Sequence, residues 1–257
     1  MPNQPPIAVW LNSYEQSLKP ALDSAARDGF GLIQINAAAE RELQDFSRTA
    51  QRHFAHHLQS LGMEVDALAA AHGGLGLADR DKGDDRIIDL RRTLELCAAL
   101  HIPRATVNIA GFSDETTRPL ADESLRIAAE LASNFGVTLA VQTSTADIPA
   151  LADHLHRLRC PNLGLAVDSV QSVADDLRDK LHGHVHAAYV RDARKLGQQF
   201  EEADYGRGDV DFAGFLGRLA DWEYRRPLTL RRSGLAGSVD ALRRGREYFQ
   251  SLLGISG

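Results

Sequence analysis

The chain has 257 residues, of which 44% are hydrophobic, and its formal net charge is −6. This length and composition predict one large hydrophobic core and a single domain over residues 1–257. Because the arginines are scattered among acidic residues rather than gathered in a stripe, the charge pattern argues against a nucleic acid partner.

The first ten residues, MPNQPPIAVW, contain no basic segment followed by an apolar one, and no apolar run approaches the roughly 18 residues that span a bilayer. We therefore expect a cytoplasmic protein with no membrane partner. Cys97 and Cys160 stand far apart and fit no disulfide or zinc motif, so we interpret both as buried thiols.

Short apolar or β-branched runs alternate with amphipathic stretches along the whole chain, a pattern that predicts βα units. The expected strands cover residues 7–11, 32–35, 64–69, 105–110, 137–141, 163–167, 186–190 and 227–230. Eight such strands in about 250 residues are typical of a single (β/α)8 TIM barrel. An open doubly wound sheet would need a glycine-rich turn after its first strand, and WLNSYEQ is not one.

The segments between the strands fit helices on the outside of a barrel. Residues 18–30, 87–102 and 124–137 each carry an apolar stripe of helical period and end at a glycine or a short turn. Two irregular stretches follow strands, at residues 73–85 and 191–209, where this fold places lids and substrate loops. We interpret the first as a mobile lid.

Active sites of TIM barrels lie at the carboxyl ends of the strands, so the polar residue just past each strand is a candidate site residue. Amides, a phenol and an imidazole together supply hydrogen-bond donors and acceptors for a small polyhydroxylated molecule. The candidates in chain order are Asn12, Asn36, His72, Asn108, Gln142, Asp168, Tyr189 and Arg231.

Five segments of the chain resemble the sugar phosphate isomerases and epimerases with a xylose isomerase-like TIM barrel. The segments are RDGFGLIQIN, GVTLAVQT, LGLAVDSVQ, HAAYVRDA and YGRGDVDFAGFLGRLADWEYRRPLTLRR. The last is the most specific, because it combines a Gly-x-Gly-x-Val-Asp-Phe turn, a helix, a tyrosine and a Pro-Leu-x-Leu strand. The resemblance covers nearly the whole length and implies a TIM barrel that acts on a sugar, a polyol or a sugar phosphate.

The resemblance also implies a divalent metal such as Mg, Mn, Co or Zn, held by two glutamates, an aspartate and a histidine. At these positions the chain carries Gln142, Asp168, Tyr189 and Arg231, so only the aspartate is kept. A histidine that often follows that aspartate in the family is replaced by Gln171. We therefore expect no metal and no other cofactor.

The replacements change the chemistry that the site can perform. A glutamine amide cannot accept a proton at neutral pH, and a permanently charged guanidinium repels a dication. We expect Arg231 to occupy the place of the metal and to pair with Asp168, with Gln142 and Tyr189 completing the hydrogen bonds.

Three other groups of residues invite a functional reading. His182, His184 and His186 alternate along a strand and could suggest a zinc site. If Tyr189 points into the barrel, however, Val185 and Ala187 share its face, and His184 and His186 face outward or lie near the bottom rim. His53, His56 and His57 fit a solvated helix face. In the loop after Tyr189, Asp192 and Lys195 are candidate contacts for a phosphate or a sugar hydroxyl, or else solvated loop charges.

Two functional readings stay open from the sequence. In the first, the protein is a metal-independent enzyme of the isomerase or epimerase type, in which Tyr189 or His72 moves protons and Arg231 polarises a carbonyl. In the second, it is a non-catalytic barrel that binds another protein or forms a homo-oligomer. A DNA-repair endonuclease would need a cluster of metal ligands and a basic groove, and neither is visible.

Overall fold

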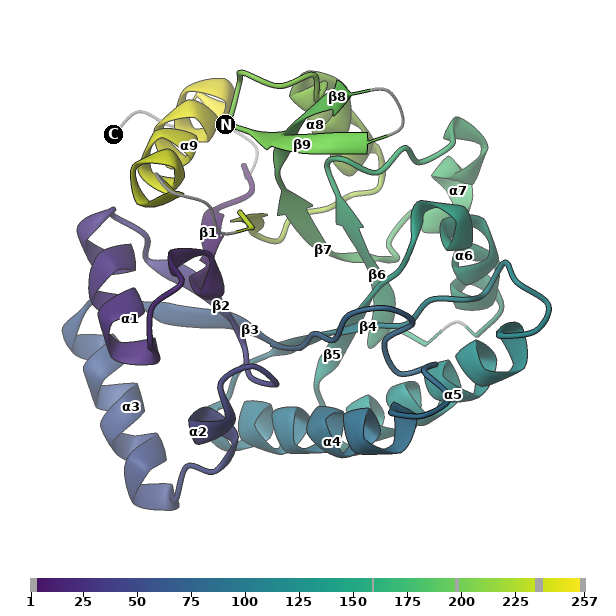
Figure 1. Ribbon diagram of the computed structural model, residues 1–257, viewed down its shortest axis with the longest axis horizontal. Coiled ribbons are helices and arrows are strands. Elements are labelled where there is room, and N and C mark those ends of the chain that lie inside the picture. Colours follow the sequence, from purple (N-terminus) through teal and green to yellow (C-terminus); the bar gives the residue numbers. More distant parts are fainter. Residues whose placement is uncertain (1–3, 159, 197–198, 234–237, 255–257) are drawn as a thin grey trace.

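The computed structural model describes residues 4–158, 160–196, 199–233 and 238–254. Eight parallel strands close into a barrel in the order β1, β10, β7, β6, β5, β4, β3, β2 (Figure 1). This confirms the predicted TIM barrel. The strands are β1 (Ile7–Trp10), β2 (Leu32–Asn36), β3 (Glu64–Ala70), β4 (Arg104–Asn108), β5 (Thr138–Gln142), β6 (Leu163–Asp168), β7 (Val185–Val190) and β10 (Leu228–Leu230).

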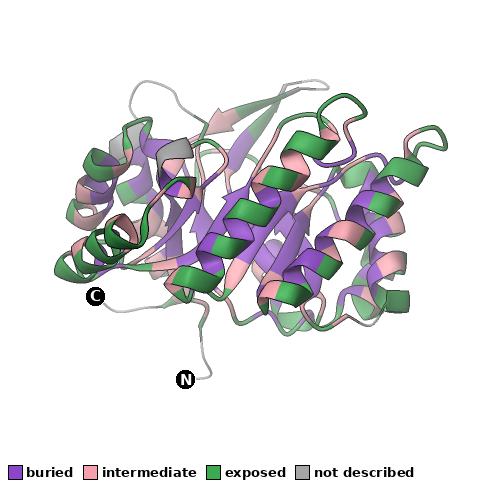
Figure 2. Ribbon diagram, turned by 90° about the horizontal axis from the view of Figure 1, so that it is seen from below, coloured by how far each residue is buried: buried purple, intermediate pink, exposed green. Residues whose placement is uncertain are grey.

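Helices surround the barrel and turn their exposed faces to solvent, while the strands between them are buried (Figure 2). None of the described helices is long and apolar enough to cross a membrane. The α-helices are α1 (Leu18–Arg27), α2 (Arg41–Gln44), α3 (Arg48–Ser60), α4 (Gly83–Leu100), α5 (Arg118–Phe135), α6 (Ile148–Leu158), α7 (Arg178–Leu181), α8 (Phe212–Asp221) and α9 (Ser238–Leu253). Short 3-10 helices cover η1 (Leu11–Tyr14), η2 (Thr145–Asp147) and η3 (Asp175–Leu177).

The three predicted helices are present as α1, α4 and α5, although α4 and α5 begin several residues earlier than the apolar stripes indicated. Helix α5 ends at Gly136, whose backbone adopts φ 65°, a conformation that glycine reaches without steric cost. Of the two cysteines, Cys97 is buried as expected, whereas Cys160 is only half-buried; both are free thiols.

The stretch at 191–209, which the sequence indicated as irregular, contains an antiparallel hairpin. Its strands are β8 (Asp192–Leu196) and β9 (Gln199–Ala203), and they lie outside the barrel order. The residues at 73–85 pack onto the barrel instead of standing clear of it as a lid. Leu77 and Ala78 are buried, and the Leu77 N–H donates to the carbonyl of Asn108 (2.9 Å).

Strand β7 carries a bulge that changes which residues face inward. Leu165 pairs with Val185 and Ala166 pairs with Ala187, so His186 is an extra residue in the ladder. The prediction that Val185 shares the face of Tyr189 is therefore wrong, since Val185 packs in the outer core cluster. The ring of His186 lies against Gly164, where a Cβ would come within 2.4 Å of it.

Candidate functional site

Two aromatic rings form the floor of the barrel mouth. The inner face of the barrel carries small residues at Ala140, Ala166 and Ala187, which leave room for the buried rings of Trp10 and Tyr189. The two rings meet edge to face, with centroids 5.8 Å apart and an interplanar angle of 82°. Such a contact stabilises the pair beyond the burial of its apolar surface.

Arg231 lies on this aromatic floor. Its guanidinium carbon is 4.8 Å from the centroid of the Trp10 ring and 5.5 Å from that of the Tyr189 ring, within the range of cation–π contact. Its Nη1 donates to Oε1 of Gln142 at 3.4 Å, and the same oxygen accepts from Nδ2 of Asn108 at 3.3 Å. The structure thus brings together four residues predicted for the site: Asn108, Gln142, Tyr189 and Arg231.

Asp168 pairs with a residue that the sequence analysis did not select. Its Oδ2 accepts from both Nε and Nη2 of Arg191, each at 2.9 Å, and its side chain is only 1% exposed. Its Oδ1 accepts from the backbone N–H of Val170 at 3.2 Å. The predicted ion pair between Asp168 and Arg231 is therefore wrong: these two described residues form no salt bridge.

The spacing of Arg191 could have revealed it. It lies two residues after Tyr189, and alternate residues of a strand face the same side. Gln171 supports the same corner of the site, because its Oε1 accepts from the Asp168 N–H (3.0 Å) and its Nε2 donates to the carbonyl of Thr143 (2.7 Å).

The hydroxyl of Tyr189 points down into the barrel and donates to Oγ1 of Thr106 at 3.0 Å. The side chain is 1% exposed, and this burial raises the pKa of Tyr189 above its usual value, with the Thr106 hydrogen bond acting in the opposite direction. The phenol therefore stays protonated and presents its ring, rather than its hydroxyl, to Arg231.

The next three candidates have partners outside this cluster. His72 faces helix α4, where its Nε2 is 3.7 Å from Oδ2 of Asp89; burial lowers the pKa of His72, and Asp89 partly offsets that effect. Asn36 bonds to both backbone groups of Ala71, and Asn12 Oδ1 accepts from the Asn36 N–H at 2.8 Å. These side chains hold the strand ends together.

The two candidates in the hairpin also serve the fold. The Asp192 carboxylate accepts from the backbone N–H groups of Ala193, Arg207, Gly208 and Val210, and the residue is 1% exposed. Lys195 is exposed on β8, and its backbone N–H donates to Asp209 at 2.9 Å. Among the described residues, neither side chain forms a hydrogen bond or a salt bridge with Arg191 or Arg231.

The cluster does not fit a divalent metal. Its one carboxylate, Asp168, is neutralised by Arg191, and the space above the aromatic floor holds the fixed positive charge of Arg231. Hard cations need several carboxylate or neutral imidazole ligands. Within the described ranges, no group of three or more His, Cys, Asp or Glu side chains could hold a metal ion.

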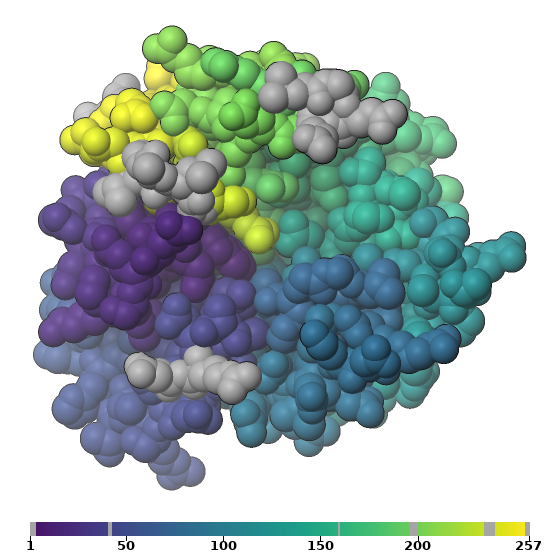
Figure 3. All heavy atoms as spheres, viewed as in Figure 1, coloured from purple at the N-terminus to yellow at the C-terminus, as the bar shows by residue number. Residues whose placement is uncertain are grey.

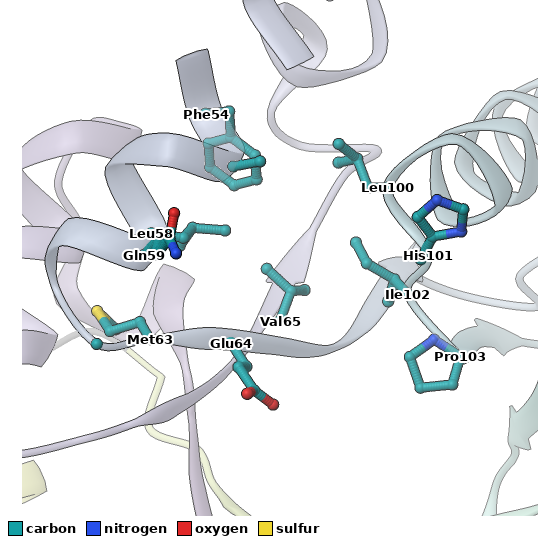
Figure 4. A pocket seen from close by; sticks show the side chains of 12 residues that line it. Phe54, Leu58, Gln59, Met63, Glu64, Val65, Leu100, His101, Ile102 and Pro103 are labelled. Atoms are coloured by element: carbon teal, nitrogen blue, oxygen red, sulfur yellow. The ribbon is translucent and has the colours of Figure 1, made fainter. Parts of the chain in front are cut away.

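Figure 3 looks onto the face that carries the β8–β9 hairpin, and this face is hollowed between the hairpin and the loops on the opposite side. A separate pocket of about 500 Å³ lies at the other end of the barrel, where Glu64 begins β3 and Pro103 precedes β4 (Figure 4). Apolar side chains of α3 and α4 line much of that pocket, and it contains none of the clustered polar groups described above.

A family profile described as "Xylose isomerase-like TIM barrel" matches residues 22–252. A comparison with curated proteins finds no match. Among solved structures, a xylose isomerase domain protein from Planctomyces limnophilus is similar with 20% identity and a TM-score of 0.78, over 98% of each chain.

Two further solved structures are similar. An IolI protein with a bound zinc atom has 15% identity and a TM-score of 0.77, over 97% of this chain and 98% of its own. The 3-keto-D-glucoside 4-epimerase of E. coli has 14% identity and a TM-score of 0.71, over 96% of this chain and 100% of its own. At these identities the likeness shows the fold.

Proposed function

Because the chain belongs to the xylose isomerase-like TIM barrel family, we propose that its barrel mouth binds a small sugar, polyol or sugar phosphate without a divalent metal. One observation carries this proposal. The guanidinium of Arg231 covers the aromatic floor at the centre of the site, and Arg191 takes up the Asp168 carboxylate. Both arginines repel a dication, so a metal-dependent mechanism has no place to operate.

As an enzyme, the protein would be a metal-independent isomerase or epimerase. Arg231 would stabilise the negative charge that develops on a carbonyl oxygen when a neighbouring carbon loses its proton, which is the task of the metal in a metal-dependent enzyme. Tyr189 or His72 would move the proton. Gln142 and Asn108, next to Arg231, would orient the hydroxyl groups of the ligand.

A non-catalytic role is the second candidate, and the position of the two proton-transfer groups favours it. The Tyr189 hydroxyl is buried on Thr106, and the His72 imidazole faces Asp89 on α4. Neither group is aimed at the space above Arg231. In this reading the barrel keeps its ligand pocket and acts as a binding or assembly partner for another protein or for a second copy of itself.

Calorimetry with Mn²⁺ and with a panel of polyols, keto-sugars and sugar phosphates tests the proposal, with turnover of each bound compound followed by NMR. We expect binding of a panel compound with no dependence on added Mn²⁺ or on EDTA. Turnover that is lost in Tyr189→Phe, with binding retained, supports the enzyme; binding without turnover supports the second role. A ligand that binds only with Mn²⁺ present contradicts the proposal.

A further inference from the structure

Two arginines stand side by side at the barrel mouth. The register pairs Leu230 of β10 with Val190 of β7, so Arg231 and Arg191 follow at neighbouring positions of adjacent strands. The Arg231 N–H also donates to the Val190 carbonyl at 3.0 Å. Backbones of adjacent strands are about 4.8 Å apart, so the two arginine side chains, each with a permanent positive charge, start from neighbouring points of the barrel wall.

Only one of these two charges is balanced. Arg191 pairs with Asp168, whereas Arg231 forms no ion pair with any residue that the structure describes. The next residue shows the contrast. Arg232, whose side chain is 11% exposed, pairs with both Glu202 (3.3 Å) and Asp204 (2.7 Å). A half-buried arginine with no acidic partner is costly to the fold, so its retention at the centre of a binding site points to a ligand that carries the missing negative charge.

The two guanidinium groups also have unused hydrogen-bond donors. Arg231 makes one long side-chain hydrogen bond through Nη1, and its Nε and Nη2 have no partner among the described residues. Arg191 uses Nε and Nη2 on Asp168, which leaves Nη1. A planar fork of N–H donors matches the oxygen pair of a carboxylate or a phosphate group.

We propose that the ligand of this site is the anionic form of a small polyhydroxylated molecule, a sugar acid or a sugar phosphate, whose acidic group binds Arg231 beside Arg191. This proposal rests on the proposed function, since it assigns a substrate class to the same site. The hydroxyl groups of the ligand would lie toward Asn108 Oδ1 and Gln142 Nε2, which form no hydrogen bond with another described residue.

The test compares three six-carbon ligands that differ in charge, with inorganic phosphate as the anion that has no carbon chain. Isothermal calorimetry at low ionic strength uses gluconate, the neutral polyol glucitol, glucose 6-phosphate and inorganic phosphate. We expect gluconate or glucose 6-phosphate to bind at least about tenfold more tightly than glucitol, as one charge-assisted contact predicts. The tighter of the two tells whether the acidic group is a carboxylate or a phosphate ester. The affinity should fall as KCl is added.

Variants locate the contact. Arg231→Gln should weaken binding of the anionic ligand about 10- to 100-fold and weaken glucitol binding by a much smaller factor. Arg231→Lys keeps the charge but loses the fork, so we expect a smaller loss, and it serves if the glutamine variant does not fold. Arg178→Gln is the matched control, because Arg178 is an exposed arginine of α7 that pairs with Asp221 on the surface and forms no hydrogen bond or salt bridge with a described residue of the site.

Each outcome separates the two proposals. Equal affinity for glucitol and for the anions overturns the charge assignment and leaves the proposed function standing. Inorganic phosphate that binds as tightly as glucose 6-phosphate supports the anion site but overturns the assignment of a carbohydrate ligand. Anion binding that is unchanged in both Arg231 variants overturns the contact proposed here. Failure of every compound to bind overturns both proposals.

Discussion

Arg191 should be essential for stability because it neutralises a buried carboxylate. Asp168 is 1% exposed, and both nitrogens that bond to its Oδ2 come from Arg191 at 2.9 Å. Removing one partner of a fully buried ion pair costs about 3–5 kcal/mol. The Arg191 side chain is 30% exposed, so water replaces part of what is lost, and we expect Arg191→Gln to lower the free energy of unfolding by about 2–3 kcal/mol.

Urea denaturation of a double-mutant cycle measures this effect. Asp168→Asn removes the buried charge, so Arg191→Gln in that background should cost less than about 1 kcal/mol. Arg178→Gln breaks a surface ion pair of similar length with Asp221 and should cost about 0–1 kcal/mol. The reasoning is refuted if Arg191→Gln is as mild as the surface control, or if its cost is the same with and without the Asp168 charge.

Three further predictions concern the residues around the site. Burial lowers the pKa of His186 to about 4, with Arg226 adding to the effect, so the folded protein takes up fewer protons than the unfolded chain between pH 6.5 and 4. Stability should therefore fall by about 2 kcal/mol from pH 7.5 to 5, and denaturation curves of His186→Gln should lack that part of the pH dependence. Tyr189→Phe removes the donor to Thr106 and should cost about 1–1.5 kcal/mol in thermal or urea unfolding, whereas adding Thr106→Val should bring no further loss, because no buried hydroxyl then lacks a partner. Asp192→Asn leaves one acceptor oxygen for four backbone N–H groups and so loosens the loop that holds the β8–β9 hairpin. Limited proteolysis should then cut the hairpin faster than in the parent protein. An unchanged cutting rate would contradict the structural role given to this carboxylate.

The strands could be predicted from the alternation of apolar runs with amphipathic stretches. The polar residues that end β4 and β5 and follow β10 could be predicted from the position of the active site in TIM barrels. Parallel strands of a closed barrel must end on one face, so Asn108, Gln142 and Arg231 had to lie near one another. The antiparallel hairpin was missed because its strands lie outside the barrel, where the alternation of helices and strands gives no guidance.

The partner of Asp168 was missed because only the residue just past each strand was taken as a candidate, and Arg191 did not meet that rule. Asp168 ends β6 and pairs with Arg191, which follows the neighbouring strand β7. Arg231 follows β10, on the far side of β7, and packs on the rings of Trp10 and Tyr189 instead. The orientation of His186 depends on a bulge in β7, and one extra residue reverses the side on which each later residue lies.

Manganese binding to the native protein decides whether the barrel mouth excludes divalent metals. Electron paramagnetic resonance of Mn²⁺ titrated against the metal-stripped protein should show only free ion. The reason is that Arg231 places a positive charge at the centre of the site and Arg191 already pairs with Asp168, the carboxylate of the cluster. The triple variant Gln142→Glu, Tyr189→His, Arg231→Glu, which adds two carboxylates and an imidazole to the native Asp168, should bind Mn²⁺ if it folds. Stoichiometric binding of Mn²⁺ to the native protein that is abolished in Asp168→Asn would contradict the account.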